Sequence, residues 1–423
     1  MMRSLRARLL PLHLGVALQG FVLWYPVEKL FMTEIGFDAA TVGIMAAAYA
    51  AVVPLFEVPS GVLADRWSRR GVLVVASAAL AVCSLVSGLS TNVPTYIAGV
   101  LALGLYFAMY SGTLEAMVYD TVLEETGGSA GFERRLGRVR FVESVALVAS
   151  SLAGGVVAGL LDTRATYFLT VPFALGSIAC YLRFREPTLH RAAERTPLRE
   201  HLATTARAAH RQLLPIIALA VLTPMLMQVI FEFGPLWLVV LGVSAVRYGP
   251  YWAGLMSTLG LGGLLAGWLA RPARLAAAAC LIAASMAVLA VSHDFLTVTA
   301  AQIVAALLLV ALGVHVTQLL HDAVPSTVRA GVASGVSTLS WLVFLPFSLL
   351  FGWISDSAGL HRAAVLLVGA AVAIGLLLGW TKNRDHGHQA VVRVDDDVVA
   401  GVDGRDRVGV EVGDGRYAGD DRA

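Results

Sequence analysis

The chain has 423 residues, of which 57% are hydrophobic and only 14% are charged. Soluble domains carry about 25% charged residues, so this composition excludes an ordinary soluble protein and indicates a membrane protein. The formal net charge of +2 comes from basic residues scattered between apolar segments, and no nucleic-acid partner is expected.

Twelve long apolar segments follow one another along the chain and predict twelve transmembrane helices. Each is close to the length of about 20 residues that a helix needs to cross a bilayer. The segments are continuous, whereas the strands of a membrane β-barrel would be short and alternating. The sequence therefore predicts an all-α membrane protein with spans at residues 10–33, 39–64, 71–90, 94–123, 138–161, 165–184, 213–241, 248–270, 273–292, 295–322, 327–354 and 361–381.

The Lys and Arg residues between the spans predict the orientation of the chain. With the N-terminus inside, twenty of them lie on inner connections up to residue 381, and four lie on the outer side: Lys29, Arg164, Arg247 and Arg362. Cytoplasmic loops of membrane proteins carry the excess of positive charge. We therefore expect a multi-pass protein of the cell (plasma or inner) membrane with both termini in the cytoplasm.

One long polar connection divides the chain into six spans and six. Residues 185–212 carry basic residues together with apolar residues at roughly helical spacing, which predicts a cytoplasmic amphipathic linker. The flanking units are an N-terminal six-helix bundle, residues 1–184, and a C-terminal six-helix bundle, residues 213–381. Residues 382–423 alternate acids with Val and Gly and predict a disordered cytoplasmic tail.

The two halves share a weak internal repeat. Gly36, Gly43, Gly61, Leu63 and Ala64 match Gly242, Gly249, Gly267, Leu269 and Ala270 at a constant offset of 206 residues. One such match means little, but a shared offset at the same place relative to the spans is typical of a duplicated unit. Parallel repeats of six spans are a transporter architecture with the binding site between the halves. The sequence thus predicts two pseudo-symmetric bundles.

A charged segment, GVLADRWSRRG at residues 61–71, joins the second and third spans. It resembles the loop signature of the major facilitator superfamily, Gly-x-Leu-Ala-Asp-Arg-x-Gly-Arg-Lys. Two positions depart mildly: Ser68 replaces the second Gly, and Arg70 stands for Lys. The location of the match and the count of twelve spans agree with it. The chain therefore resembles a carrier of this family over residues 1–381.

The resemblance implies a conformational latch that holds the two bundles together in the outward-facing state. Asp65 is expected to face the start of the eleventh span near Ser326, and the arginines to engage Asp120 at the inner end of the fourth span. The alternative is that the arginines only set topology. The second-half equivalent is degenerate, with Arg271 in place of the Asp. The latch residues are Gly61, Asp65, Arg66, Arg69, Arg70 and Asp120.

Ionisable and amide side chains inside the spans form the second group of candidate residues. Such residues are costly in a bilayer and mark functional sites, and a buried carboxylate can carry a proton near neutral pH. The proton-coupling and substrate candidates are Glu28, Glu57, Glu115, Glu143, Glu232, His315 and Gln228. For each acid the alternative is a structural hydrogen bond, and Lys29 offers Glu28 a local ion pair.

These features predict a proton-coupled exporter of small hydrophobic or cationic compounds. No basic cluster is suited to an anionic substrate, and the acids suit a cation. The exporter signature of the family is matched only in part, because SSLAGGVVAG at residues 150–159 lacks its proline. The alternative is a proton-coupled uptake symporter of the same fold.

A membrane-embedded enzyme is least favoured, because no catalytic, metal or phosphate motif occurs. We expect no enzyme activity, cofactor or metal, and a monomer whose partners are a small molecule, protons and lipid.

Overall fold

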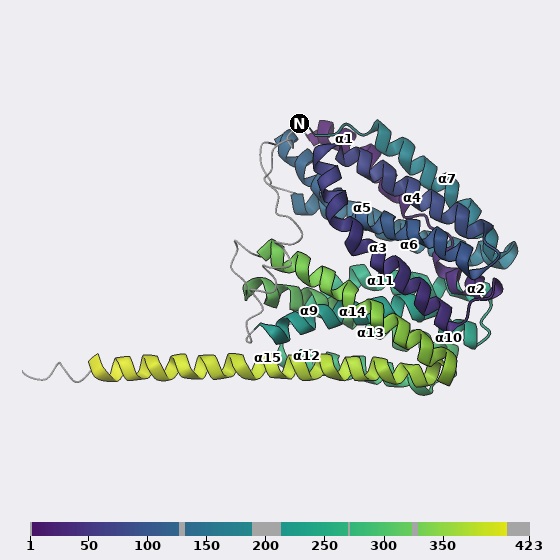
Figure 1. The fold of residues 1–423 in the computed structure, drawn as a ribbon. Helices are drawn as coiled ribbons and strands as arrows, with labels where there is room; N and C mark the ends of the chain where they lie inside the picture. The colour runs from purple at the N-terminus through teal and green to yellow at the C-terminus, as the bar shows by residue number, and fades with distance from the viewer. Residues whose placement is uncertain (1, 127–131, 188–212, 270, 324–328, 404–423) are drawn as a thin grey trace, which may run out of the picture. The chain divides into compact units, whose positions relative to one another are not determined.

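A computed structural model describes residues 2–126, 132–187, 213–269, 271–323 and 329–403 (Figure 1). Most of the predicted linker and the end of the predicted tail therefore lie outside the described residues. No strand occurs in the described part. The elements are α1 (Met2–Gln19), η1 (Tyr25–Val27), α2 (Glu28–Glu34), α3 (Ala39–Arg66), α4 (Arg69–Leu89), α5 (Val93–Thr126), α6 (Phe132–Leu160), α7 (Thr163–Arg183), α9 (Leu214–Phe233), α10 (Pro235–Val240), α11 (Ala245–Leu269), α12 (Pro272–Val291), α13 (Phe295–Asp322), α14 (Arg329–Ala358) and α15 (Leu360–Asp403).

Eleven segments of the described chain are long and apolar enough to cross a membrane. The remaining predicted span, residues 10–33, is broken into α1, η1 and α2, with no helix at residues 20–24. Gly20 weakens the helix, and Pro26 lacks the N–H that a continuous helix would need. With these three elements taken as one crossing, the chain has the twelve crossings predicted. Span seven is similarly divided, at Gly234, into α9 and α10.

Neighbouring helices satisfy the polar backbone that this break exposes. The Leu23 N–H donates to the Thr170 hydroxyl on α7 (3.1 Å), and the Ser150 hydroxyl on α6 donates to the Gly20 carbonyl (3.2 Å). A Cβ at Gly154 would clash with the Leu23 carbonyl, so only glycine admits the broken segment there. Irregular backbone at membrane depth is tolerated only where protein groups pair with it in this way.

The repeat appears in the backbone at the ends of α2 and α10. Gly36 and Gly242 have φ of +94° and +64°, a region that favours glycine. The N–H of Phe37 bonds to the Met32 carbonyl, and the N–H of Val243 bonds to the Leu238 carbonyl, each at 3.0 Å. This is the same helix-ending motif at the offset of 206 residues. It supports the two pseudo-symmetric bundles, α1–α7 and α9–α15.

We call the end of the bundles that carries Gly36 and Gly242 the distal end, and the end that carries the N-terminus the proximal end. Aspartates cap three helices at the distal end. The Asp38 carboxylate accepts from the Thr41 N–H (2.7 Å), and that of Asp294 accepts from the Thr297 N–H (2.8 Å). These backbone hydrogen bonds lower the pKa of both carboxyl groups. Asp162 caps α7 in the same way.

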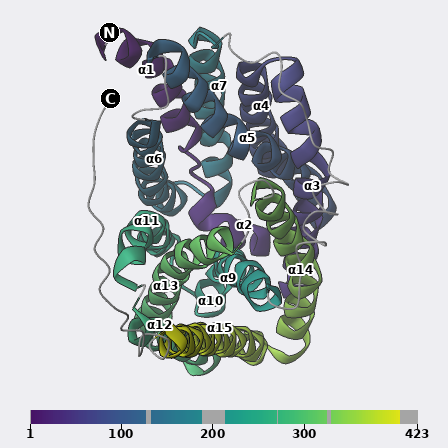
Figure 2. The same cartoon turned by 90° about the vertical axis from the view of Figure 1, so that its left-hand side faces the viewer.

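Two pairs of helices make the most extensive contacts between the bundles: α3 with α14, and α6 with α11 (Figure 2). Glycines let the backbones approach closely near the distal end. A Cβ at Gly43 would lie 2.6 Å from the Ser348 carbonyl oxygen, and one at Gly249 would lie 2.8 Å from that of Ser151. Gly43 and Gly249 are a predicted repeat pair, so the two contacts are related by the pseudo-symmetry.

The last helix, α15, differs from the sequence prediction. The predicted span ends at residue 381, but α15 continues to Asp403. Residues 382–403 are therefore helical, where the sequence predicts a disordered tail. Extending a formed helix needs no new nucleus, which accounts for the continuation. Residues 379–423 form a separate unit from residues 1–378. The predicted boundaries of linker and tail stay predictions.

Candidate functional site

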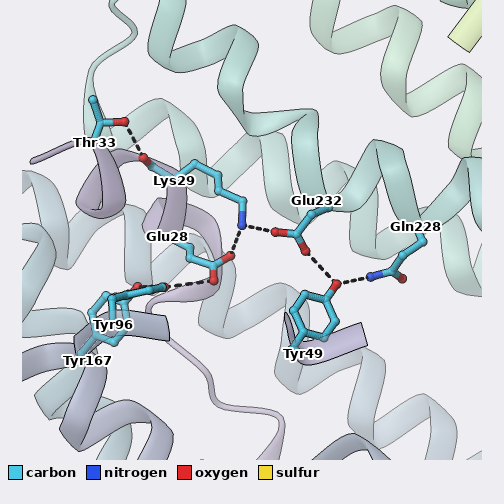
Figure 3. Close-up of polar contacts among 8 residues, drawn as sticks. All are labelled: Glu28, Lys29, Thr33, Tyr49, Tyr96, Tyr167, Gln228 and Glu232. Atoms are coloured by element: carbon cyan, nitrogen blue, oxygen red, sulfur yellow. Dashed lines mark hydrogen bonds and ion pairs between the residues drawn. The ribbon is translucent and has the colours of Figure 1, made fainter. Parts of the chain in front are cut away.

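A buried lysine joins the two bundles near the distal end (Figure 3). The Lys29 ammonium lies 2.8 Å from the Glu28 carboxylate of its own helix and forms a second ion pair with Glu232 of α9. The Lys29 side chain is only 1% exposed, and that of Glu232 is 9% exposed. Two carboxylates thus share one ammonium group inside the protein.

Three tyrosines and a glutamine complete this group. The Tyr49 hydroxyl on α3 donates to Glu232 (2.8 Å) and accepts from the Gln228 amide (2.6 Å). The Tyr96 hydroxyl on α5 donates to Glu28 (3.0 Å) and lies 2.9 Å from the Tyr167 hydroxyl. We call the whole set the Lys29 cluster; its members are Glu28, Lys29, Tyr49, Tyr96, Tyr167, Gln228 and Glu232 (Figure 3).

Glu28 and Glu232 lie beside the helix breaks in the first and seventh spans. Glu28 is the first residue of α2, where the positive end of the helix dipole favours a carboxylate. Glu232 lies at the end of α9, two residues before the break at Gly234. The sequence prediction includes Glu28, Glu232 and Gln228 but treats Lys29 as an outer loop charge or a local partner of Glu28. A lysine inside a predicted span was the signal that could have identified it.

A second cluster lies between α5 and α6 and is centred on Arg140. The Arg140 guanidinium donates to Glu115 (2.8 Å) and to Glu143 (2.9 Å), and the Tyr110 hydroxyl donates to Glu143 (2.9 Å). We call these four residues the Arg140 cluster. The side chains of Arg140 and Glu115 are 40% and 51% exposed. The sequence prediction includes both acids as candidates but counts Arg140 among the charges of the inner connection, because it lies only two residues inside the predicted span at 138–161.

At the proximal end, the structure brings together two of the latch residues. Arg69 of α4 forms an ion pair with Asp120 of α5, and the Asp120 side chain is 2% exposed. This contact lies within the first bundle. Glu186, which the sequence does not single out, accepts from the Ser68 hydroxyl and the Arg69 N–H, each at 2.6 Å. It therefore caps α4 at the start of the predicted linker.

The other candidates stand apart from these groups. Arg70 donates to the Phe184 carbonyl (3.4 Å) of the first bundle. The half-buried His315 of α13 makes no polar contact among the described residues. The side chains of Glu57, Asp65 and Arg66 and the surroundings of Gly61 lie outside what the structure describes, as does the expected partner segment at Ser326.

Replacing Asp120 with alanine is expected to lower the free energy of unfolding by about 3 kcal/mol, because it removes a buried carboxylate from its ion pair with Arg69. Thermal unfolding of the purified protein in detergent measures this loss. Arg362→Ala, an exposed position, is the control and should change stability by less than about 0.5 kcal/mol. An Asp120→Ala loss no larger than that of the control would contradict a stabilising ion pair.

The sequence matches the model of the Major Facilitator Superfamily over residues 9–341. The chain therefore belongs to the Major Facilitator Superfamily, and it is a multi-pass membrane protein of the transporter type. No curated protein matches the sequence.

Solved structures with the same fold are transporters. The nucleoside transporter NupG, in its D323A mutant, gives a TM-score of 0.74 at 10% identity, covering 88% of this chain and 99% of that one. A bacterial homologue of the human lysosomal transporter Spinster, inward-facing and occupied, gives 0.69 at 14% identity, covering 90% and 97%. The D-xylose–proton symporter gives 0.64 at 13% identity, covering 87% and 96%. At these identities the likeness shows the fold.

Proposed function

We propose that this chain is a secondary active transporter of the cell membrane that works by alternating access and exports small hydrophobic or cationic compounds in exchange for protons. One observation supports the proposal most directly. The Lys29 cluster and the Arg140 cluster each hold two carboxylates and one base. Each cluster therefore carries one negative charge in excess when all its groups are ionised, which suits a cationic substrate or a proton.

The Arg140 cluster fits a place on the substrate path. Charged side chains within membrane spans face a bundle interior or a water-filled cavity, since facing lipid is costly. Glu115 and Arg140 are both substantially exposed in the structure. We infer that they face the space that alternating access opens to water. Protonation of Glu115 or Glu143 would leave Arg140 paired with the other acid, so the cluster could gain and lose one proton while its remaining ion pair stays intact.

The latch remains part of the proposal. Arg69 and Asp120 hold α4 and α5 together, and the segment that carries Asp65 directly precedes Arg69. We propose that residues 61–70 contact the second bundle when the proximal ends meet. In that state the distal ends, which the glycines now hold together, would separate.

Inward transport is the second candidate. The name of the D-xylose–proton symporter describes movement of a sugar together with a proton, and that protein shares the fold. The exporter signature on α6 is also incomplete, because residues 150–159 contain no proline. Cells with and without the gene, loaded with a fluorescent organic cation, separate the two candidates. Lower accumulation in cells that carry the gene supports export, and higher accumulation supports uptake.

Proteoliposomes test the proton coupling directly. We expect an imposed pH gradient to drive uptake of an organic cation into vesicles that contain the wild-type protein. Glu57→Gln, Glu115→Gln, Glu143→Gln and Glu232→Gln are each measured beside it. At least one should lose gradient-driven accumulation by about tenfold or more, since glutamine cannot carry a proton. Retention by all four would show that none of these acids couples transport to protons.

A further inference from the structure

The Lys29 cluster resembles an occupied binding site for an amine, in which the amine is supplied by the protein itself. We propose that Glu232 binds the ammonium group of a primary or secondary aromatic amine substrate, and that the Lys29 side chain competes for this carboxylate while the distal ends of the bundles are together. This inference rests on the proposed transport function and names its substrate class.

Glu28 and Glu232 differ in their contacts, and the difference identifies Glu232 as the carboxylate that binds the substrate. Lys29 and Tyr49, its polar partners among the described residues, both belong to the opposite bundle (Figure 3). Glu28 instead contacts Lys29 and Tyr96, both of its own bundle. When the distal ends separate, Glu28 keeps its lysine and Glu232 loses both partners.

A buried carboxylate that loses its ion-pair partner is strongly destabilised, so Glu232 needs a replacement cation. A substrate ammonium group carries the same charge as Lys29 and makes the same kind of hydrogen bond. One substrate ammonium group therefore replaces the one ammonium group that Glu232 loses. Gln228, one helical turn before Glu232, loses the Tyr49 hydroxyl at the same time and can donate to or accept from the ligand.

Aromatic rings of both bundles, one of them on the residue before Glu232, indicate the aromatic part of the substrate. Phe231, the preceding residue, lies edge-on to Trp252 of α11 at a centroid distance of 5.8 Å. Tyr25 of η1 lies 6.4 Å from the same indole, so the three rings come from both bundles. Rings of this kind attract organic cations through their π faces.

The indole of Trp252 also has an unused hydrogen-bond donor. Trp252 is 7% exposed, and its Nε1–H has no partner in the described part of the chain. A buried indole N–H normally finds an acceptor. A hydroxyl or ether oxygen on the ligand would supply one.

Binding to the purified full-length protein in nanodiscs tests the inference without requiring transport. The probe is phenethylamine, and phenethyl alcohol is the neutral probe of the same shape. We expect Lys29→Ala to bind phenethylamine about tenfold more tightly than wild type, because the competitor is gone. Glu232→Gln should lose phenethylamine binding, and so should the double variant. Phenethyl alcohol should show no dependence on either residue.

Glu34→Gln is the matched control. Glu34 lies on the same helix as Lys29, is exposed, and accepts a hydrogen bond from Thr163. It is not a member of the Lys29 cluster, so the Glu34→Gln protein should bind phenethylamine with the affinity of wild type. If Lys29→Ala does not fold, Glu232→Gln decides alone. Unchanged phenethylamine binding in Glu232→Gln, or equal binding of both probes, overturns the inference.

The two proposals fail separately. Proteoliposomes that move an organic cation and protons normally after Glu232→Gln would refute the amine site and leave proton-coupled transport standing. Amine binding that depends on Glu232 and Lys29, together with no proton movement under an imposed pH gradient, would refute the proton coupling and leave the site standing.

Discussion

Replacing Lys29 with alanine is expected to lower the thermal stability of the protein at pH 7 much more than replacing Glu232 with glutamine. Lys29→Ala leaves the buried Glu232 and the half-buried Glu28 without their shared cation, a change that typically costs about 3–5 kcal/mol. Glu232→Gln leaves Lys29 paired with Glu28 at 2.8 Å and keeps an acceptor for Tyr49, so its cost should be about 1 kcal/mol. Thermal unfolding in detergent compares the two.

Glu34→Gln serves again as the control, because its side chain is exposed on the same helix as Lys29. Equal losses for Lys29→Ala and Glu232→Gln at pH 7 would contradict the shared ion pair.

Replacing Gly249 with leucine is expected to reduce transport by more than about tenfold. A Cβ at this position would lie 2.8 Å from the Ser151 carbonyl oxygen, which is backbone and has little freedom to move. Interiors resist inserted volume, so the leucine should keep α6 and α11 apart. A carrier whose distal ends cannot meet cannot complete its cycle. Uptake of an organic cation into proteoliposomes measures the loss.

Gly263→Leu is the matched control on the same helix, because a Cβ there would meet nothing within 4 Å. It should retain most of the transport. Accessibility gives a second measurement. Ser348 is fully buried against α3, and Ser348→Cys in a background without the three native cysteines should react faster with a maleimide when Gly249→Leu is added. Unchanged reactivity together with normal transport would show that close approach at Gly249 is not needed.

Most of the fold could be predicted from the sequence, because continuous apolar segments fix where helices cross a membrane. The predicted span at residues 273–292 is α12 within one residue at either end, and that at 71–90 is α4 within two. The break at residues 20–24 was missed, since its residues are as apolar as the helices beside them. Hydropathy indicates which segments of the chain lie within the membrane. It carries little information on whether the backbone of such a segment stays helical.

The acids of the candidate site could be predicted, and their bases could not. A carboxylate inside an apolar segment stands out, so the sequence singles out Glu28, Glu115, Glu143 and Glu232 as candidates, and their roles stay predictions. Lys29 and Arg140 lie near predicted span ends, where basic residues normally set topology. Their role depends on helices packed together from distant parts of the chain: Lys29 and Glu232 are 203 residues apart. No local pattern specifies such a contact.

The unwound segment at residues 20–24 also constrains how this protein can change over evolution. Its backbone depends on a hydroxyl at Thr170, a hydroxyl at Ser150 and the absence of a side chain at Gly154. These three positions lie on two other helices and are individually ordinary. They should nevertheless vary together with the segment among relatives, and a relative that regained a continuous first helix would be free to lose all three.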